Sequence, residues 1–179
     1  MTRRALTLIV VGLVSLACAA IAIADVNSAK DPSGDVKHNP AGDDSRYDIV
    51  KVSYGHTTDG KLVNKVKVKG NVFAPNSKSG SPPLLWIDVP GKVASRAGCN
   101  YSDYFVIDSE VDECGDGPKT GDAKITKLDA HTLQLVFAPA AIGSPAKYGI
   151  AFVEEGSNAK GLVFFDRAPD KGFFQHKLP

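Results

Sequence analysis

The sequence lacks the patterns from which most catalytic functions are inferred. Its 179 residues contain no HExxH, GxSxG or P-loop motif, and its four histidines (His38, His56, His131 and His176) have no recognisable catalytic or zinc spacing. Met1 is the only methionine and would leave with a cleaved leader, which excludes haem ligation by Met and His in the mature chain. These absences argue against an enzyme.

Charge and cysteine content narrow the class further. The chain carries 21 basic and 20 acidic side chains, a balance that offers no electrostatic footprint for nucleic acid. Cys18 lies in the apolar leader, which leaves Cys99 and Cys114. Two cysteines of an exported protein usually pair, and this bridge would close a loop of about 15 residues, worth roughly 3 kcal/mol in the chain-entropy account. We therefore predict a structural disulfide, Cys99–Cys114.

The chain opens with the layout of a secretion signal. Arg3 and Arg4 give a positive start, residues 5–20 form an apolar run, and small residues offer a cleavage site between Ala24 and Asp25. The run is also about long enough for a retained membrane anchor. That alternative stays open, although the alanine-rich end favours cleavage. We predict a secreted, extracytoplasmic protein with no membrane contact beyond the signal peptide; the sequence does not indicate its oligomeric state.

Short strands separated by turns make up most of the remaining chain. Val66 and Val68 alternate with lysines, as in a strand with one buried and one solvated face. Residues 84–89 show no such alternation, so we expect them to be buried on both faces, with Trp86 in the core. No helical stripe exceeds about two turns. The expected strands are 47–54, 65–72, 84–89, 101–111, 122–128, 131–138, 148–152 and 161–165.

This series of strands predicts an all-β fold. We expect a single antiparallel β-sandwich, jelly-roll or immunoglobulin-like, of about 8–10 strands. The absence of a sequence repeat argues against a propeller or a solenoid. The expected organisation is a signal peptide over residues 1–24, a polar lead-in loop over 25–46 and the β-sandwich domain over 47–179.

Carboxylates and aromatic rings are the side chains with the most evident binding chemistry. Asp31 and Asp35 lie four residues apart in a turn shaped by Pro and Gly, and calcium takes oxygen ligands from such irregular loops. Aspartates also cap turns through their own side chains, and spacing alone favours that simpler interpretation. Tyr101 and Tyr104, beside the predicted disulfide, are candidates for exposed rings that stack on a sugar.

Three segments together resemble a known family. The opening DPSGD is followed by YDIVKVSYGHTTDGKLVNKVKV, a middle LLWIDV leads to CNYSDYFV, and the close runs LQLVFAPAAIGSPAKYGIAFVEE to FFDRAPDKG. Over most of residues 31–172 this layout resembles secreted bacterial DOMON-like β-sandwiches, relatives of carbohydrate-binding modules. The resemblance implies that the D-x-x-GD and D-x-A-P-D motifs mark the edges of the domain. It makes Asp31, Asp35 and Asp166 the positions to test for calcium.

On these grounds we expect a secreted, non-catalytic binding module that recognises an extracellular carbohydrate or a similar surface ligand. Tyr101 and Tyr104 are its expected ligand contacts, and calcium is the cofactor that the resemblance suggests. The alternative is a structural or interaction scaffold that contacts another component of the cell envelope. The chain lacks the set of exposed tryptophans that many sugar-binding surfaces carry, so the ligand stays open.

Overall fold

The computed structural model describes seven stretches of the chain, residues 22–39, 45–72, 84–92, 102–107, 109–114, 117–157 and 163–178. The predicted signal peptide lies almost wholly outside these residues, as do Tyr101 and Cys99. Within them, no helix has the length and apolar character needed to cross a bilayer. The one helical element they contain is a short 3-10 turn, η1 (Pro139–Ile142).

The described residues form twelve strands, and every pairing between them is antiparallel. The strands are β1 (Ile23–Lys30), β2 (Lys37–Asn39), β3 (Ile49–Thr57), β4 (Leu62–Val68), β5 (Leu84–Asp88), β6 (Tyr104–Ile107), β7 (Glu110–Glu113), β8 (Lys119–Lys127), β9 (Thr132–Phe137), β10 (Lys147–Ser157), β11 (Val163–Ala168) and β12 (Phe174–Lys177). The all-β, antiparallel class is therefore confirmed.

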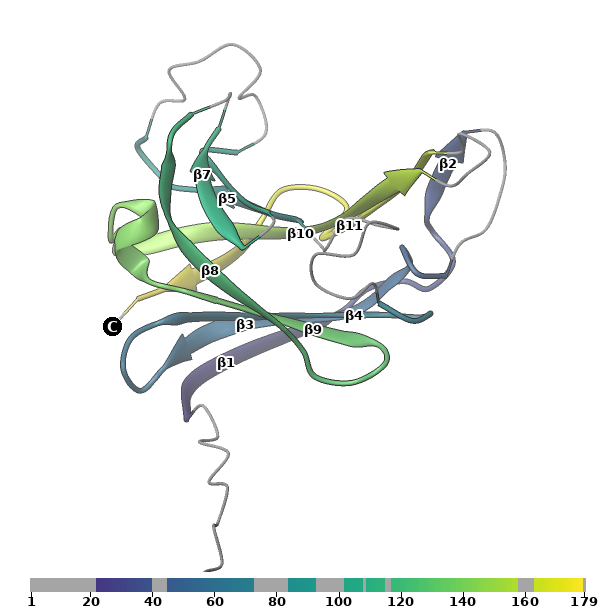
Figure 1. Cartoon of the computed structure of the whole chain (residues 1–179), viewed down its shortest axis with the longest axis horizontal. Helices are drawn as coiled ribbons and strands as arrows, with labels where there is room; N and C mark the ends of the chain where they lie inside the picture. The colour runs from purple at the N-terminus through teal and green to yellow at the C-terminus, as the bar shows by residue number, and fades with distance from the viewer. Residues whose placement is uncertain are drawn as a thin grey trace, which may run out of the picture.

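All of these strands belong to one continuous sheet that curls into a half-barrel. Its order is β1-β3-β4-β9-β8-β7-β6-β5-β10-β11-β2, and β12 pairs with β10 beside β11. β8 connects the two halves because its first residues pair with β7 and residues 123–127 pair with β9 (Figure 1). The curl brings the two ends of the sheet together, and the backbone N–H of Ile49 in β3 donates to Asp166 in β11.

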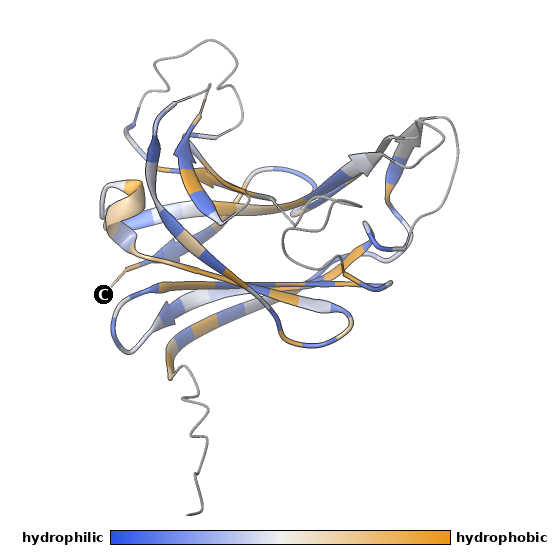
Figure 2. Cartoon of the chain, in the orientation of Figure 1, coloured by the Kyte–Doolittle hydropathy of each residue, from blue (hydrophilic) through white to orange (hydrophobic). Residues whose placement is uncertain are grey.

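The core lies between the two halves of the curled sheet. Hydrophobic and hydrophilic residues alternate along most strands (Figure 2), because successive side chains of a strand point to opposite faces. Leu133, Leu135 and Phe137 of β9 are buried against the interior, and so are Ile150 and Phe152 of β10. Each such side chain contributes about 1.5–3 kcal/mol on burial. The strands expected over 131–138 and 148–152 are confirmed as β9 and part of β10.

Three predictions about strand positions were wrong. Residues 25–46, expected as a lead-in loop, contain most of β1 and all of β2. β1 is mostly exposed and is held through backbone pairing with β3, so it carries no hydrophobic pattern. The strand expected over 101–111 is instead the hairpin β6–β7, with Ser109 at φ 70°. β12, beyond the last predicted strand, was missed.

β5 also differs from its prediction. Leu85 and Ile87 are fully buried, as expected for an apolar run. Trp86 lies between them on the opposite face of the sheet and is only partly buried. The expectation that β5 is covered on both faces, with Trp86 in the core, was therefore wrong.

Candidate functional site

Three aspartates that the resemblance singled out lie together in the structure. Asp31 follows β1, Asp35 precedes β2 and Asp166 lies in β11. One carboxylate oxygen from each lies within 4.8 Å of the others. This acidic cluster occupies a seam where the two ends of the curled sheet meet, so folding assembles it from opposite ends of the chain.

Asp48 ties the DPSGD turn to the start of β3. Its side chain is fully buried, and Oδ2 accepts hydrogen bonds from the backbone N–H of Gly34 at 2.9 Å and from Ser33 Oγ at 3.3 Å. Gly34 has φ +90°, a left-handed conformation that favours glycine. Lys69 Nζ lies 3.4 Å from the same oxygen and supplies one positive charge. The turn is thus held in the shape that presents Asp31 and Asp35.

Asp166 is fixed by two backbone donors. The N–H of Ile49 donates to Oδ2 at 2.7 Å and the N–H of Arg167 donates to Oδ1 at 2.7 Å. The bond to Ile49 joins residues 117 positions apart and crosses from β3 to β11. Only 3% of Asp166 is exposed, so the orientation of its carboxylate is set by the fold.

The carboxylates of the acidic cluster repel one another in a poorly solvated place. Burial raises the pKa of Asp31 to about 7, and the negative charge of Asp166 adds to this effect. Burial also raises the pKa of Asp166 to about 6, although its two backbone donors oppose the shift. Glu154 faces Asp166 across the β10–β11 pair, and burial raises its pKa well above the usual value. A bound cation would offset this repulsion.

The oxygens of the cluster fit calcium. Two of them, Asp31 Oδ2 and Asp35 Oδ1, and Oδ1 of the neighbouring Asp48 are buried without a hydrogen-bond partner among the described residues. Buried polar atoms are normally paired, so unpartnered ones indicate a missing water or ion. Calcium binds oxygens at 2.3–2.6 Å, which places opposite ligands about 4.6–5.2 Å apart. The ligand oxygens of Asp31, Asp35 and Asp166 lie within 4.8 Å of one another, close enough to contact one such ion. The all-oxygen donor set suits a hard cation.

A groove lined by aromatic rings lies next to the acidic cluster. Arg167 follows Asp166 in β11, and its side chain therefore points to the opposite face of the strand. Its guanidinium carbon lies 5.5 Å from the ring centroid of Trp86 and 5.3 Å from that of Phe173. Phe165 completes the groove, which has a volume of about 560 Å³. Arg167 also donates hydrogen bonds to the carbonyls of Pro169 and Gly172, which fixes its position.

A larger hollow lies elsewhere in the molecule. It has a volume of about 720 Å³ and borders the β3–β4 turn at Thr58 and Asp59. Within the described stretches, two groups of at least three metal-ligating side chains converge. Neither group lines this hollow, so we place the candidate site at the acidic cluster and the groove.

The structure assigns the other predicted site residues differently. Tyr104 is 6% exposed and belongs to the core, where its hydroxyl accepts a hydrogen bond from Lys92 Nζ at 2.6 Å. The expectation that Tyr104 offers an exposed ring was therefore wrong, because β6 turns it to the same side as Val106. Tyr101 lies outside the described residues. Cys114 is buried, but Cys99 is not described, so their pairing stays a prediction.

Sequence reasoning missed Asp48, Arg167 and Phe173 as members of the site. Asp48 was visible only as one more acid after the DPSGD turn. Arg167 lies inside the D-x-A-P-D motif, which pointed to Asp166 alone. Trp86, the single tryptophan, could have indicated the groove. Its apolar neighbours in the sequence suggested a core position instead.

No family model, curated protein or solved structure gave a significant match to this chain. The resemblance to DOMON-like domains therefore stays a prediction based on the short motifs given above.

Proposed function

We propose that this protein is a secreted, non-catalytic binding module of β-sandwich type that uses calcium to support a carbohydrate-binding surface. The observation that carries the proposal is the convergence of Asp31, Asp35 and Asp166, with unpartnered buried oxygens, next to the groove at Trp86 and Arg167. Calcium would lock the seam between β3 and β11. The groove, on the other face of β11, would contact the ligand.

Support for calcium comes from the cost of the acidic cluster without a cation. Several carboxylates share one partly buried region, and the ion pair of Lys69 there is with Asp48. The charged groups that shift the pKa of Asp31 are all aspartates. Like charges at short range disfavour ionisation. A divalent ion bound by the folded chain would remove this penalty and raise stability by mass action. Turn capping explains only part of the geometry, since it leaves three oxygens without donors.

Support for a carbohydrate ligand comes from the lining of the groove. The flat rings of Trp86 and Phe173 suit the apolar face of a pyranose. Arg167 has five N–H donors, and the two bonds to backbone carbonyls leave others to reach ligand oxygens. Concave sites with aromatic walls and few fixed polar groups are typical of small-ligand binding. These residues replace Tyr104 as the proposed ligand contacts, and Tyr101 stays a prediction.

Calcium binding is tested by thermal unfolding of the purified protein in chelator and in added calcium. We expect calcium to raise Tm, and Asp31→Asn to abolish the rise. Asp129→Asn is the matched control, because Asp129 is an exposed aspartate in the β8–β9 turn. A Tm that responds to neither calcium nor chelator would contradict calcium binding and indicate that the aspartates only cap the turn.

Ligand binding is tested by retention on insoluble polysaccharides and isolated cell walls, with and without calcium. Phe173→Ala should abolish retention, whereas Leu128→Ala, which truncates an exposed side chain in a distant turn, should not. Retention released by a soluble sugar would identify the ligand class. Failure to bind any polymer, with calcium binding intact, would contradict the carbohydrate proposal and favour the alternative of an envelope scaffold.

A further inference from the structure

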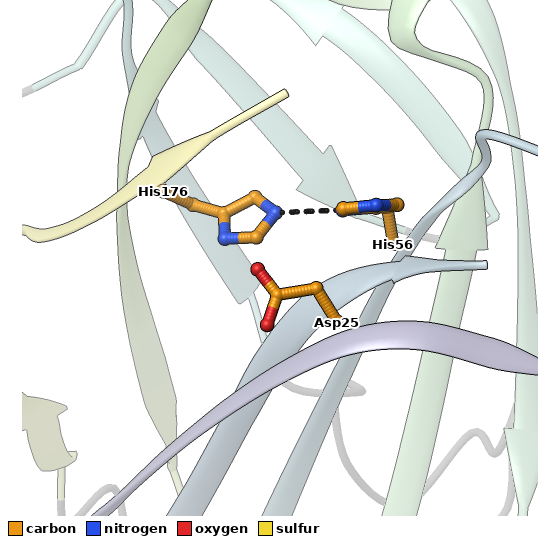
Figure 3. Close-up of side chains that lie close together, drawn as sticks. All are labelled: Asp25, His56 and His176. Carbon is orange, nitrogen blue, oxygen red and sulfur yellow. Dashed lines mark hydrogen bonds between the residues drawn. The ribbon is translucent and has the colours of Figure 1, made fainter. Parts of the chain in front are cut away.

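A second group of ligating side chains converges away from the acidic cluster. Asp25, His56 and His176 each place one ligand atom within 4.8 Å of the others. His56 Nδ1 lies 3.3 Å from His176 Nε2, and the carboxylate of Asp25 lies beside the two rings (Figure 3). We call this group the imidazole cluster. Nothing in the sequence links its members, since the two histidines are 120 positions apart.

The sheet positions the imidazole cluster through strand register. Asp25 of β1 pairs directly with His56 of β3, next to a bulge in β1. The glycine that precedes His56 allows β1 to approach closely, because a Cβ at Gly55 would lie 1.9 Å from the carbonyl oxygen of Asp25. His176 comes from β12, where it pairs with Tyr148 of β10. The cluster thus closes a seam between the two ends of the curled sheet.

The separation of the two ring nitrogens suits a shared metal ion. Tetrahedral zinc binds histidine nitrogens at 2.0–2.1 Å, which places two such nitrogens about 3.3–3.4 Å apart. The observed 3.3 Å agrees with that value. It lies just beyond the 2.7–3.2 Å range of N–H···O hydrogen bonds. A carboxylate as third ligand, here Asp25, is common in zinc sites.

The surroundings of His176 also suit a metal ligand. Only 2% of His176 is exposed, so the orientation of its ring is set by the fold. Asn27 lies against the other ring nitrogen, with its amide nitrogen 3.3 Å from Nδ1. The amide flipped by 180° would place its oxygen there. That oxygen would accept the Nδ1 proton and leave Nε2 for the ion.

Two further observations indicate a ligand at this place. Tyr148, whose ring lies edge-on 5.6 Å from that of His176, has a buried hydroxyl without a partner among the described residues. A surface pocket lined by Asp25, His176, Lys147 and Lys177 adjoins the cluster and gives an ion access from solvent. The two lysines lower the affinity for a bare cation, but they suit a small anion or hydroxide as its fourth ligand.

We propose that Asp25, His56 and His176 bind a divalent transition-metal ion, with zinc as the reference ion. Imidazole nitrogens with one carboxylate select such borderline ions over calcium. The site is independent of the acidic cluster and of the proposed carbohydrate ligand. Cleavage between Ala24 and Asp25, as predicted, would keep all three ligands in the mature chain.

The test is titration of the purified protein with zinc against a chromophoric chelator, with the visible spectrum of bound cobalt as a second readout. We expect one zinc ion per chain and an absorption spectrum typical of tetrahedral cobalt. His56→Gln and Asp25→Asn should each lower zinc affinity by at least about tenfold, the loss that removal of an outer-shell partner alone can cause. Both residues lie at least partly exposed, so these variants should fold.

Two controls separate this site from the acidic cluster. His131→Gln removes a histidine outside the cluster, and Asp31→Asn removes a carboxylate of the calcium site; both should bind zinc like the unaltered protein. Equal zinc affinity in the unaltered protein and His56→Gln would overturn the proposal. So would failure of the folded protein to bind zinc or cobalt. Neither result would bear on calcium binding.

Discussion

The acidic cluster and the imidazole cluster lie at opposite ends of the same strand pair. Asp25 pairs with His56 at one end of β1–β3, and Lys30 pairs with Lys51 at the other, next to Asp31. Six residues of strand span roughly 20 Å. The same spacing recurs along β10, where Tyr148 pairs with His176 and Glu154 pairs with Asp166. The curled sheet is therefore closed at two points.

The acidic cluster and the imidazole cluster differ in what stabilises them. The acidic cluster holds only oxygen ligands, and its carboxylates repel one another until a cation or protons neutralise them. The imidazole cluster contains two rings that already contact each other and one carboxylate. One strand pair thus presents a hard-ion site at one end and a borderline-ion site at the other. The two sites share the same strand pair, so the difference in their ion preference comes from the chemistry of their side chains.

Added calcium should have the largest effect on the stability of the folded state. At calcium concentrations about 100-fold above Kd, a single site stabilises the folded state by about 2.7 kcal/mol, which raises Tm by roughly 5–10 °C for a chain of this size. His56→Gln should show the same rise, since its change lies at the other seam. Differential scanning calorimetry measures both. Loss of the rise in His56→Gln would show that the two seams are coupled.

Gly55→Ala should weaken metal binding at the imidazole cluster and leave the acidic cluster unchanged. The new Cβ would meet the backbone of Asp25 at 1.9 Å, so the start of β1 must move away from β3. Overpacking of this kind costs about 1–3 kcal/mol, and displacement of Asp25 should weaken zinc binding. Zinc and calcium titrations of this variant provide the measurement. Unchanged zinc affinity would mean that Asp25 is not a ligand.

Gly34→Ala is the corresponding variant for the acidic cluster. Gly34 has φ +90° with open space around it, so alanine meets no clash but must adopt a left-handed conformation. That strain costs about 1–2 kcal/mol and should distort the turn that holds Asp31 and Asp35. Calcium affinity should fall while zinc affinity stays constant. The reverse pattern would contradict the assignment of ions to the two seams.

The acidic cluster and the imidazole cluster should also respond to pH in opposite directions. The pKa of Asp31 is raised to about 7 and that of Asp166 to about 6, so their contribution to stability is full below about pH 4 and is lost as pH rises through 6–7. The pKa of His176 is lowered by burial, so its contribution is lost as pH falls below about 6.5.

Chemical denaturation between pH 4 and 7 in chelator separates these contributions. Asp31→Asn should remove most of the gain on acidification and leave the loss that comes from His176. In calcium, acidification should destabilise the acidic cluster instead of stabilising it, because protons then compete with the bound ion. A variant that keeps the full gain on acidification would show that Asp31 does not titrate in this range.

Prediction from the sequence succeeded where a pattern reports a local requirement. Alternation in β4 identified Val66 and Val68 as buried, because one face of this strand packs on the core. The DPSGD turn and the D-x-A-P-D motif, through the family resemblance, identified three aspartates that the fold brings together. β1 was missed, because an exposed strand held by backbone pairing leaves no hydrophobic trace.

The order of residues alone established the strand-rich class, the alternating faces and the turn that presents Asp31 and Asp35, since these depend on neighbours within a few positions. The direction in which Trp86 faces and the meeting of His56 with His176 depended on the curl of the whole sheet. Strand register over more than a hundred residues sets those contacts. No local pattern encodes such a register, because many distant pairings satisfy the same alternation.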